Sequence, residues 1–153
     1  MVQRARSGLE VLDSHPQVNG ELAAVGYCFG GLAVLQLARA GVDIRAAISV
    51  HGSLTTSTPA GRGEIKARVL VCHGAIDPFV PPAQVHEFVR EMNAAEADWQ
   101  MVIYGGVTHG FTHRTGAPTS GVAYDELADR RSFTAITHFL AEAFDQELRG
   151  AEL

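Results

Sequence analysis

The stretch GYCFGG at residues 26–31 decides the fold class, because it joins an apolar run at residues 22–26 to a helical pattern at residues 30–40. It has the form G-x-C-x-G, the pattern of a nucleophile elbow in which Cys replaces Ser. Glycines are expected there because the turn is tight, and a Cβ beside the nucleophile would strike the neighbouring strand or helix. We therefore predict that Gly26 and Gly30 supply this space and that the turn presents Cys28 at a helix start.

Three further apolar runs, at residues 46–50, 69–72 and 99–104, are mostly continuous, which is typical of parallel strands covered on both faces. Helical patterns at residues 2–14, 82–95 and 124–149 accompany them, so the sequence predicts an α/β fold of about four parallel strands flanked by helices. Ligand sites in such folds lie beyond the carboxyl ends of the strands. Along the last helix, the apolar residues expected to cover the sheet are Leu127, Phe133, Ile136, Phe139, Leu140 and Phe144.

The composition describes one globular domain over residues 1–153, with 46% apolar and 19% charged residues. The net charge of −5 offers no basic surface, so we expect neither nucleic acid nor a membrane as a partner, and a small-molecule ligand instead. Cys28 and Cys72 lack the spacing of a zinc ribbon or a secreted scaffold. No signal peptide is visible at residues 1–16, which predicts a cytoplasmic location.

Two of the later runs lead into residues suited to catalysis. Asp77 follows the third run in the segment HGAIDPFVP, and His109 follows the fourth run in GGVTHGF. Nucleophile, acid and histidine in this chain order is the order of the α/β-hydrolase fold. His109 would take the proton of Cys28 and later return one to the leaving group, while Asp77 would fix the tautomer of the imidazole. The helix start would also favour the thiolate of Cys28 and so lower its pKa.

Residues beside this triad are candidates for substrate contacts. The backbone N–H of Phe29 is placed to hold a developing oxyanion. Tyr27 flanks the nucleophile, and Phe79 and Phe111 lie on the acid and base loops, which predicts an apolar pocket. His51 follows the second run, and either lines this pocket or caps backbone groups.

Structural readings compete with these assignments. Cys28 could be a buried thiol in a turn that merely joins a strand to a helix. His109 and His113 are four residues apart, as in a helical metal pair, but such a helix would have to begin with Gly110 inside a loop. We therefore expect no metal site, and we expect Cys72 to lie in the core.

The segments at residues 26–31, 73–78 and 109–111 together resemble the dienelactone hydrolase family, and residues 124–133 (YDELADRRSF) resemble one branch of it. The likeness extends from about Ala5 to Phe144. This resemblance implies a cytoplasmic, cofactor-free hydrolase that cleaves a carboxylic ester or a lactone such as dienelactone. It makes Cys28 the nucleophile, Asp77 the acid and His109 the base.

The resemblance also implies that this chain is the carboxyl-terminal half of the family fold, a partial α/β-hydrolase fold without the N-terminal strands. In the family, the front half supplies the second oxyanion donor and the strand that would pair with residues 22–26. We therefore expect an open sheet edge, through which the chain could form a homo-oligomer, swap elements with another copy or pair with a separately made partner. Two alternatives stay open, namely a weak or inactive fragment that acts as an interaction module, and a thiol redox protein that uses Cys28.

Overall fold

The computed structural model describes residues 1–115 and 119–145. In chain order the elements are α1 (Val2–Asp13), β1 (Ala23–Tyr27), α2 (Phe29–Arg39), β2 (Ala46–Val50), β3 (Arg68–Gly74), α3 (Pro82–Ala94), β4 (Trp99–Tyr104) and α4 (Glu126–Phe144). The strands form one parallel sheet in the order β1-β2-β3-β4, which confirms the predicted α/β fold class. Residues 51–67 connect β2 to β3 without a helix.

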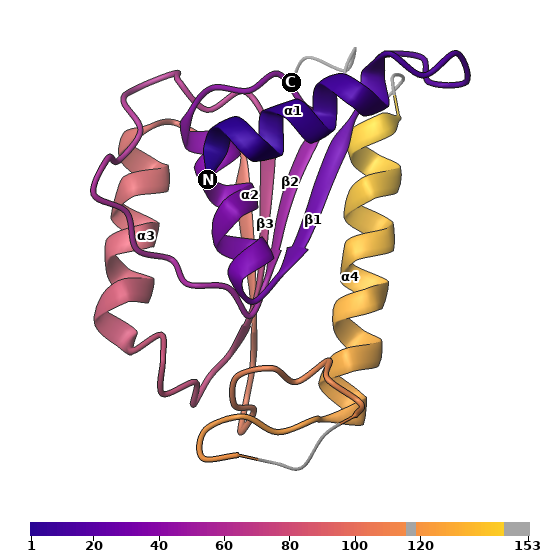
Figure 1. Cartoon of the computed structure of the whole chain (residues 1–153). Helices are drawn as coiled ribbons and strands as arrows, with labels where there is room; N and C mark the ends of the chain where they lie inside the picture. The colour runs from indigo at the N-terminus through magenta and orange to yellow at the C-terminus, as the bar shows by residue number, and fades with distance from the viewer. Residues whose placement is uncertain (116–118, 146–153) are drawn as a thin grey trace.

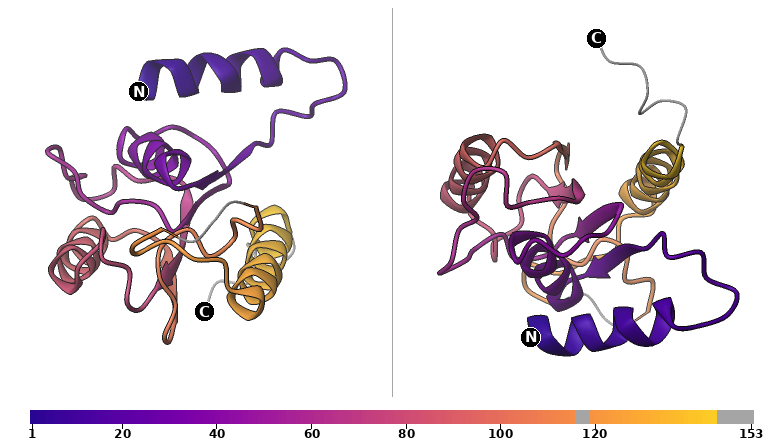
Figure 2. Two further views of the ribbon diagram at one scale, coloured as in Figure 1. Left: turned by 60° about the horizontal axis from the view of Figure 1, so that its bottom comes forward. Right: turned by 90° about the horizontal axis from the view of Figure 1, so that it is seen from above.

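Helices lie on both faces of the sheet (Figure 1). Because side chains alternate along the strands, the core is divided between these two faces. Ala47 and Val69 pack with residues of α2 and α3 on one face. Ile48 and Leu70, each one position further along, pack with residues of α4 on the other face. α1 lies outside α2, as Figure 2 shows, and packs through Leu9. The central strands β2 and β3 are therefore covered on both sides, as their continuous apolar runs predicted, whereas β1 and β4 are partly exposed.

The carboxyl ends of the four strands meet at one rim, at the bottom of Figure 1. The described parts of the segment after β4, residues 105–115 and 119–125, lie across this rim. Candidate functional residues that follow different strands are thereby brought to the same edge, which is where a parallel sheet binds its ligands.

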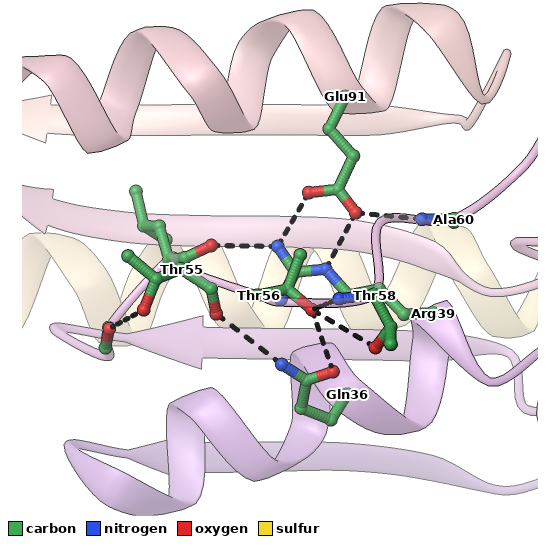
Figure 3. A network of polar contacts seen from close by, with 9 residues as sticks. Gln36, Arg39, Thr55, Thr56, Thr58, Ala60 and Glu91 are labelled. Atoms are coloured by element: carbon green, nitrogen blue, oxygen red, sulfur yellow. Dashed lines mark hydrogen bonds and ion pairs between the residues drawn. The ribbon is translucent and has the colours of Figure 1, made fainter.

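Arg39 holds the connection between β2 and β3 in place (Figure 3). Its guanidinium donates to the two carboxylate oxygens of Glu91 on α3 at 2.7 and 2.8 Å, and to the carbonyl of Leu54 at 2.8 Å. Glu91 also accepts from the backbone N–H of Ala60 at 3.1 Å. Only 3% of the Arg39 side chain and 8% of the Glu91 side chain are exposed. A buried ion pair thus ties α2, α3 and this connection together.

Asp125 caps the N-terminus of α4, because its carboxylate accepts from the backbone N–H of Ala128 at 2.8 Å. Leu127 and Phe133 do not face the sheet as predicted, because 46% and 65% of their surfaces are exposed. Ile136 and Phe139 are buried as predicted, and the buried face of the helix also carries the small residues Ala128, Ser132 and Ala143. Within the described part of the chain, no helix is both long and apolar enough to span a bilayer.

β1 forms one edge of the sheet, and among the described residues it pairs with β2 alone. Val25 and Tyr27 on this strand are 40% and 44% exposed. Val25 stands opposite Ile48 in the register, so it points to the face that α4 covers further along the sheet. β1 is therefore an apolar strand with an uncovered edge.

Candidate active site

Cys28 lies in the sharp turn between β1 and α2, and its φ of 50° is a backbone conformation that residues other than glycine rarely adopt. A Cβ on Gly26 would lie 2.1 Å from the carbonyl oxygen of Gly30, so this glycine is required, as predicted. The same prediction for Gly30 is wrong, because a Cβ on this residue would meet nothing within 4 Å. Gly31 has that role instead, since its Cβ would lie 2.6 Å from Oγ of Ser49.

The structure brings together the three residues predicted to form a triad, which follow three different strands. Sγ of Cys28 lies 3.3 Å from Nε2 of His109. Nδ1 of His109 lies 2.8 Å from Oδ2 of Asp77, whose other carboxylate oxygen accepts from the backbone N–H of Phe79 at 2.8 Å. Asp77 is buried, so the carboxylate that orients the imidazole of His109 is shielded from solvent. The arrangement suits proton transfer between Cys28 and His109.

The thiol of Cys28 is less acidic than the sequence predicts. Burial, and then the Asp77 carboxylate, raise the pKa of the Cys28 thiol above its ordinary value. We expected the start of α2 to lower this pKa. At neutral pH the thiol therefore keeps its proton, and it needs a base within reach to become a nucleophile. This also counts against the thiol redox alternative, which depends on a readily formed thiolate.

His51 faces the same sulfur from the end of β2. Its Nδ1 lies 3.3 Å from Sγ of Cys28, and its Nε2 lies 2.9 Å from the hydroxyl oxygen of Thr112. The side chain is fully buried, and its φ of 39° is strained like that of Cys28. Burial, with the neighbouring His109 and His113, lowers the pKa of His51 to about 4. His51 is thus neutral at pH 7, and it contacts the nucleophile rather than only capping backbone groups.

His113 also reaches the sulfur of Cys28, which the sequence did not predict. Its Nε2 lies 3.6 Å from Sγ of Cys28, and its side chain is exposed at the rim. The spacing of His109 and His113 suggested only a helical pair, whereas a turn at Gly110, with a φ of 64°, sends both rings toward Cys28. Ligand atoms of Cys28, His51 and His113 lie within 4.8 Å of one another, so these residues are able to hold a metal ion.

The predicted pocket residues lie at different depths. Tyr27 and Phe79 are exposed at the rim, and the ring of Phe79 stands edge-on to that of His109 with centroids 5.3 Å apart. Phe111 is fully buried and supports His51 from within the core, with ring centroids 4.9 Å apart. Phe29 is the first residue of α2, so its backbone N–H has no acceptor within the helix.

Comparisons with known proteins agree on one family. The model of the dienelactone hydrolase family matches residues 1–144. An uncharacterized protein of Caenorhabditis elegans is 39% identical over 147 residues, which cover 92% of each chain. A carboxymethylenebutenolidase homolog of Mus musculus is 32% identical over 95 residues, which cover 61% of this chain and 38% of that protein.

Solved structures extend this agreement to the fold. m3DLH superposes with a TM-score of 0.86 and 38% identity, over 92% of this chain and 60% of that one. A dienelactone hydrolase-like promiscuous phosphotriesterase from metagenomic libraries superposes with a TM-score of 0.83 and 36% identity, over 94% of this chain and 61% of that one. The chain thus spans about 60% of the length of these solved relatives. On these matches, the chain belongs to the dienelactone hydrolase family.

Proposed function

We propose that this chain hydrolyses a carboxylic ester or lactone of a small molecule, with Cys28 as nucleophile, His109 as base and Asp77 as the acid that orients it. The observation that carries the proposal is the continuous path of short contacts, 3.3 Å from Sγ to Nε2 and 2.8 Å from Nδ1 to Oδ2. The family membership of the chain supports the same class of reaction. This chemistry requires no cofactor.

The reaction starts with proton transfer, because the raised pKa of Cys28 leaves the thiol protonated at neutral pH. Nε2 of His109 takes this proton as Sγ attacks the carbonyl carbon. The backbone N–H of Phe29 donates to the oxyanion that forms. His109 then returns the proton to the leaving oxygen, and the acyl group remains on Cys28 as a thioester. Water activated by His109 hydrolyses the thioester and restores the thiol.

The rim around the sulfur suits a small substrate with an apolar part. Tyr27 and Phe79 are exposed aromatic residues beside the triad, and they are placed to contact the acyl group. Phe111 and His51 support this surface from behind, because both side chains are fully buried. A small-molecule partner and a cytoplasmic location are parts of the same proposal.

The test is turnover of p-nitrophenyl acetate and of a dienelactone by the full chain and by Cys28→Ala and His109→Ala. We expect His109→Ala to lower kcat/KM by about 10²–10⁴-fold, because it removes the base, and Cys28→Ala to abolish turnover. His138→Ala is the matched control, since His138 is an exposed histidine on α4. Equal rates in all four proteins would refute the proposal and favour the interaction module that the sequence left open.

A further inference from the structure

Three imidazole nitrogens surround the sulfur of Cys28, and the proposed mechanism uses only one of them. Nε2 of His109 is that one, and its ring is held by Asp77. Nδ1 of His51 lies equally close to the sulfur, at 3.3 Å, and Nε2 of His113 lies at 3.6 Å. We propose that Cys28, His51 and His113 form a binding site for a zinc ion, and that the bound ion blocks the nucleophile.

The spacing of the three atoms fits zinc. Bonds of about 2.3 Å to sulfur and about 2.1 Å to nitrogen, at a tetrahedral angle, place the two ligand atoms about 3.6 Å apart. The distances from Sγ of Cys28 are 3.3 Å to His51 and 3.6 Å to His113. All three ligand atoms lie within 4.8 Å of one another. Small shifts of the side chains would therefore complete three bonds to one ion.

His51 is prepared to act as a ligand. Its Nε2 lies 2.9 Å from the hydroxyl oxygen of Thr112, and donation there leaves the lone pair of Nδ1 directed at the sulfur. Such a second hydrogen bond usually orients a metal-bound histidine. The backbone N–H of Cys28 also faces Nδ1, at 3.3 Å, but it has another acceptor in the carbonyl of Val50 at 3.1 Å. The lone pair can thus pass to a metal without leaving that N–H unpaired.

The chemistry of the donors also suits zinc, which binds thiolate and imidazole well. When the ion binds, the zinc–sulfur bond replaces the S–H bond of Cys28, and the proton leaves to solvent. His113 is exposed, so the ion can enter from the rim. Three protein ligands leave a fourth position for water. The sulfur lone pair needed for attack on a carbonyl is then held by the metal.

Binding is measured on the full chain, first stripped of metal, by titration calorimetry with Zn²⁺ and by absorption spectroscopy with Co²⁺. We expect one ion per chain and the charge-transfer band of a sulfur–cobalt bond. Cys28→Ser should lose the band, and His113→Gln should weaken binding at least about tenfold, the low end of what outer-shell changes cost. Since His113 is exposed, this variant should still fold. The matched control His138→Gln should bind like the parent chain.

Absence of the cobalt–sulfur band, or equal weakening by His113→Gln and His138→Gln, would overturn the metal site. Blocking is measured separately, as the rate at which iodoacetamide alkylates Cys28 with and without saturating Zn²⁺. We expect at least a tenfold slower reaction with zinc, restored by EDTA, and an unchanged rate would refute the block.

The expected loss of ester turnover at the same zinc concentrations rests on the proposed function. A chain that binds zinc but hydrolyses nothing would refute only that function, because binding and alkylation do not depend on turnover. Higher turnover with zinc would contradict the block.

Discussion

The glycines that follow Cys28 differ in what surrounds them. A Cβ on Gly31 would lie 2.6 Å from Oγ of Ser49 and 3.1 Å from Cα of Gly52, whereas one on Gly30 would meet nothing within 4 Å. We expect Gly31→Ala to lower the free energy of unfolding by about 1–3 kcal/mol, as overpacking does. Gly30→Ala should change it by less than about 1 kcal/mol, because alanine fits a helix better than glycine. Urea denaturation measures both, and equal losses would contradict this difference.

His73 makes stability depend on pH. It is buried at the end of β3, and its Nδ1 has no partner among the described residues. Burial is the largest cause that lowers the pKa of His73 in the folded chain; Asp77 raises it and His109 lowers it. Unfolding restores the pKa of His73 to about 6.5, so below that pH the unfolded chain binds more protons than the folded chain does. The stability due to neutral His73 is therefore lost as the pH falls from about 6.5 through the folded pKa.

The measurement is urea denaturation at several pH values for the parent chain, His73→Gln and His86→Gln. We expect His73→Gln to flatten the decline below about pH 6.5. His86 is exposed on α3, so its variant should keep the slope of the parent chain. A slope unchanged by His73→Gln would rule out this role of His73.

The sequence predicted that Cys28, Asp77 and His109 come together, because each lies within five residues of the end of an apolar run and parallel strands end at one rim. It did not predict that His113 reaches the sulfur, because the direction of that ring depends on a turn at Gly110. It also misjudged the acidity of Cys28. The helix start was visible in the sequence, but the burial that raises the thiol pKa depends on the folded rim.

At the scale of elements, the buried pair of Arg39 and Glu91 is the main polar tie between α2 and α3 (Figure 3). Glu91→Gln would leave the guanidinium buried without a counter-charge, and we expect a loss of about 3–5 kcal/mol in the free energy of unfolding. The matched control is Glu96→Gln, because the pair of Arg62 and Glu96 is 76% and 58% exposed. That variant should cost less than about 1 kcal/mol. Similar losses in the two variants, measured by urea denaturation, would contradict the role of burial.

For α4, the helical pattern predicted that a helix forms more reliably than it predicted which side chains the helix buries. Helical spacing predicted a buried position for Ile136 and Phe139, which are buried, and equally for Leu127 and Phe133, which are exposed. Beside Ile136 and Phe139, the buried face also contains Ala128 and Ala143. The choice between the faces depends on the surface of β2 and β3 that the helix covers, which no pattern within the helix contains.

At the scale of the whole molecule, the uncovered edge of β1 is the feature that the family comparison makes most informative. The chain spans about 60% of the length of the solved relatives, and among the described residues no strand pairs with the outer side of β1. Exposed apolar side chains, Val25 and Tyr27, accompany that edge. Such an edge pairs readily with another chain, so we propose that the protein forms a homo-oligomer through β1.

Sedimentation velocity over a range of concentrations tests this assembly. We expect the parent chain to form dimers, and Val25→Lys to weaken them at least tenfold, which is about 1.4 kcal/mol, because charge on an edge strand opposes pairing. Ile103→Lys is the matched control, since Ile103 is 52% exposed on β4 at the opposite edge. A parent chain that stays monomeric, or dimers that Ile103→Lys disrupts while Val25→Lys does not, would show that β1 is not the interface.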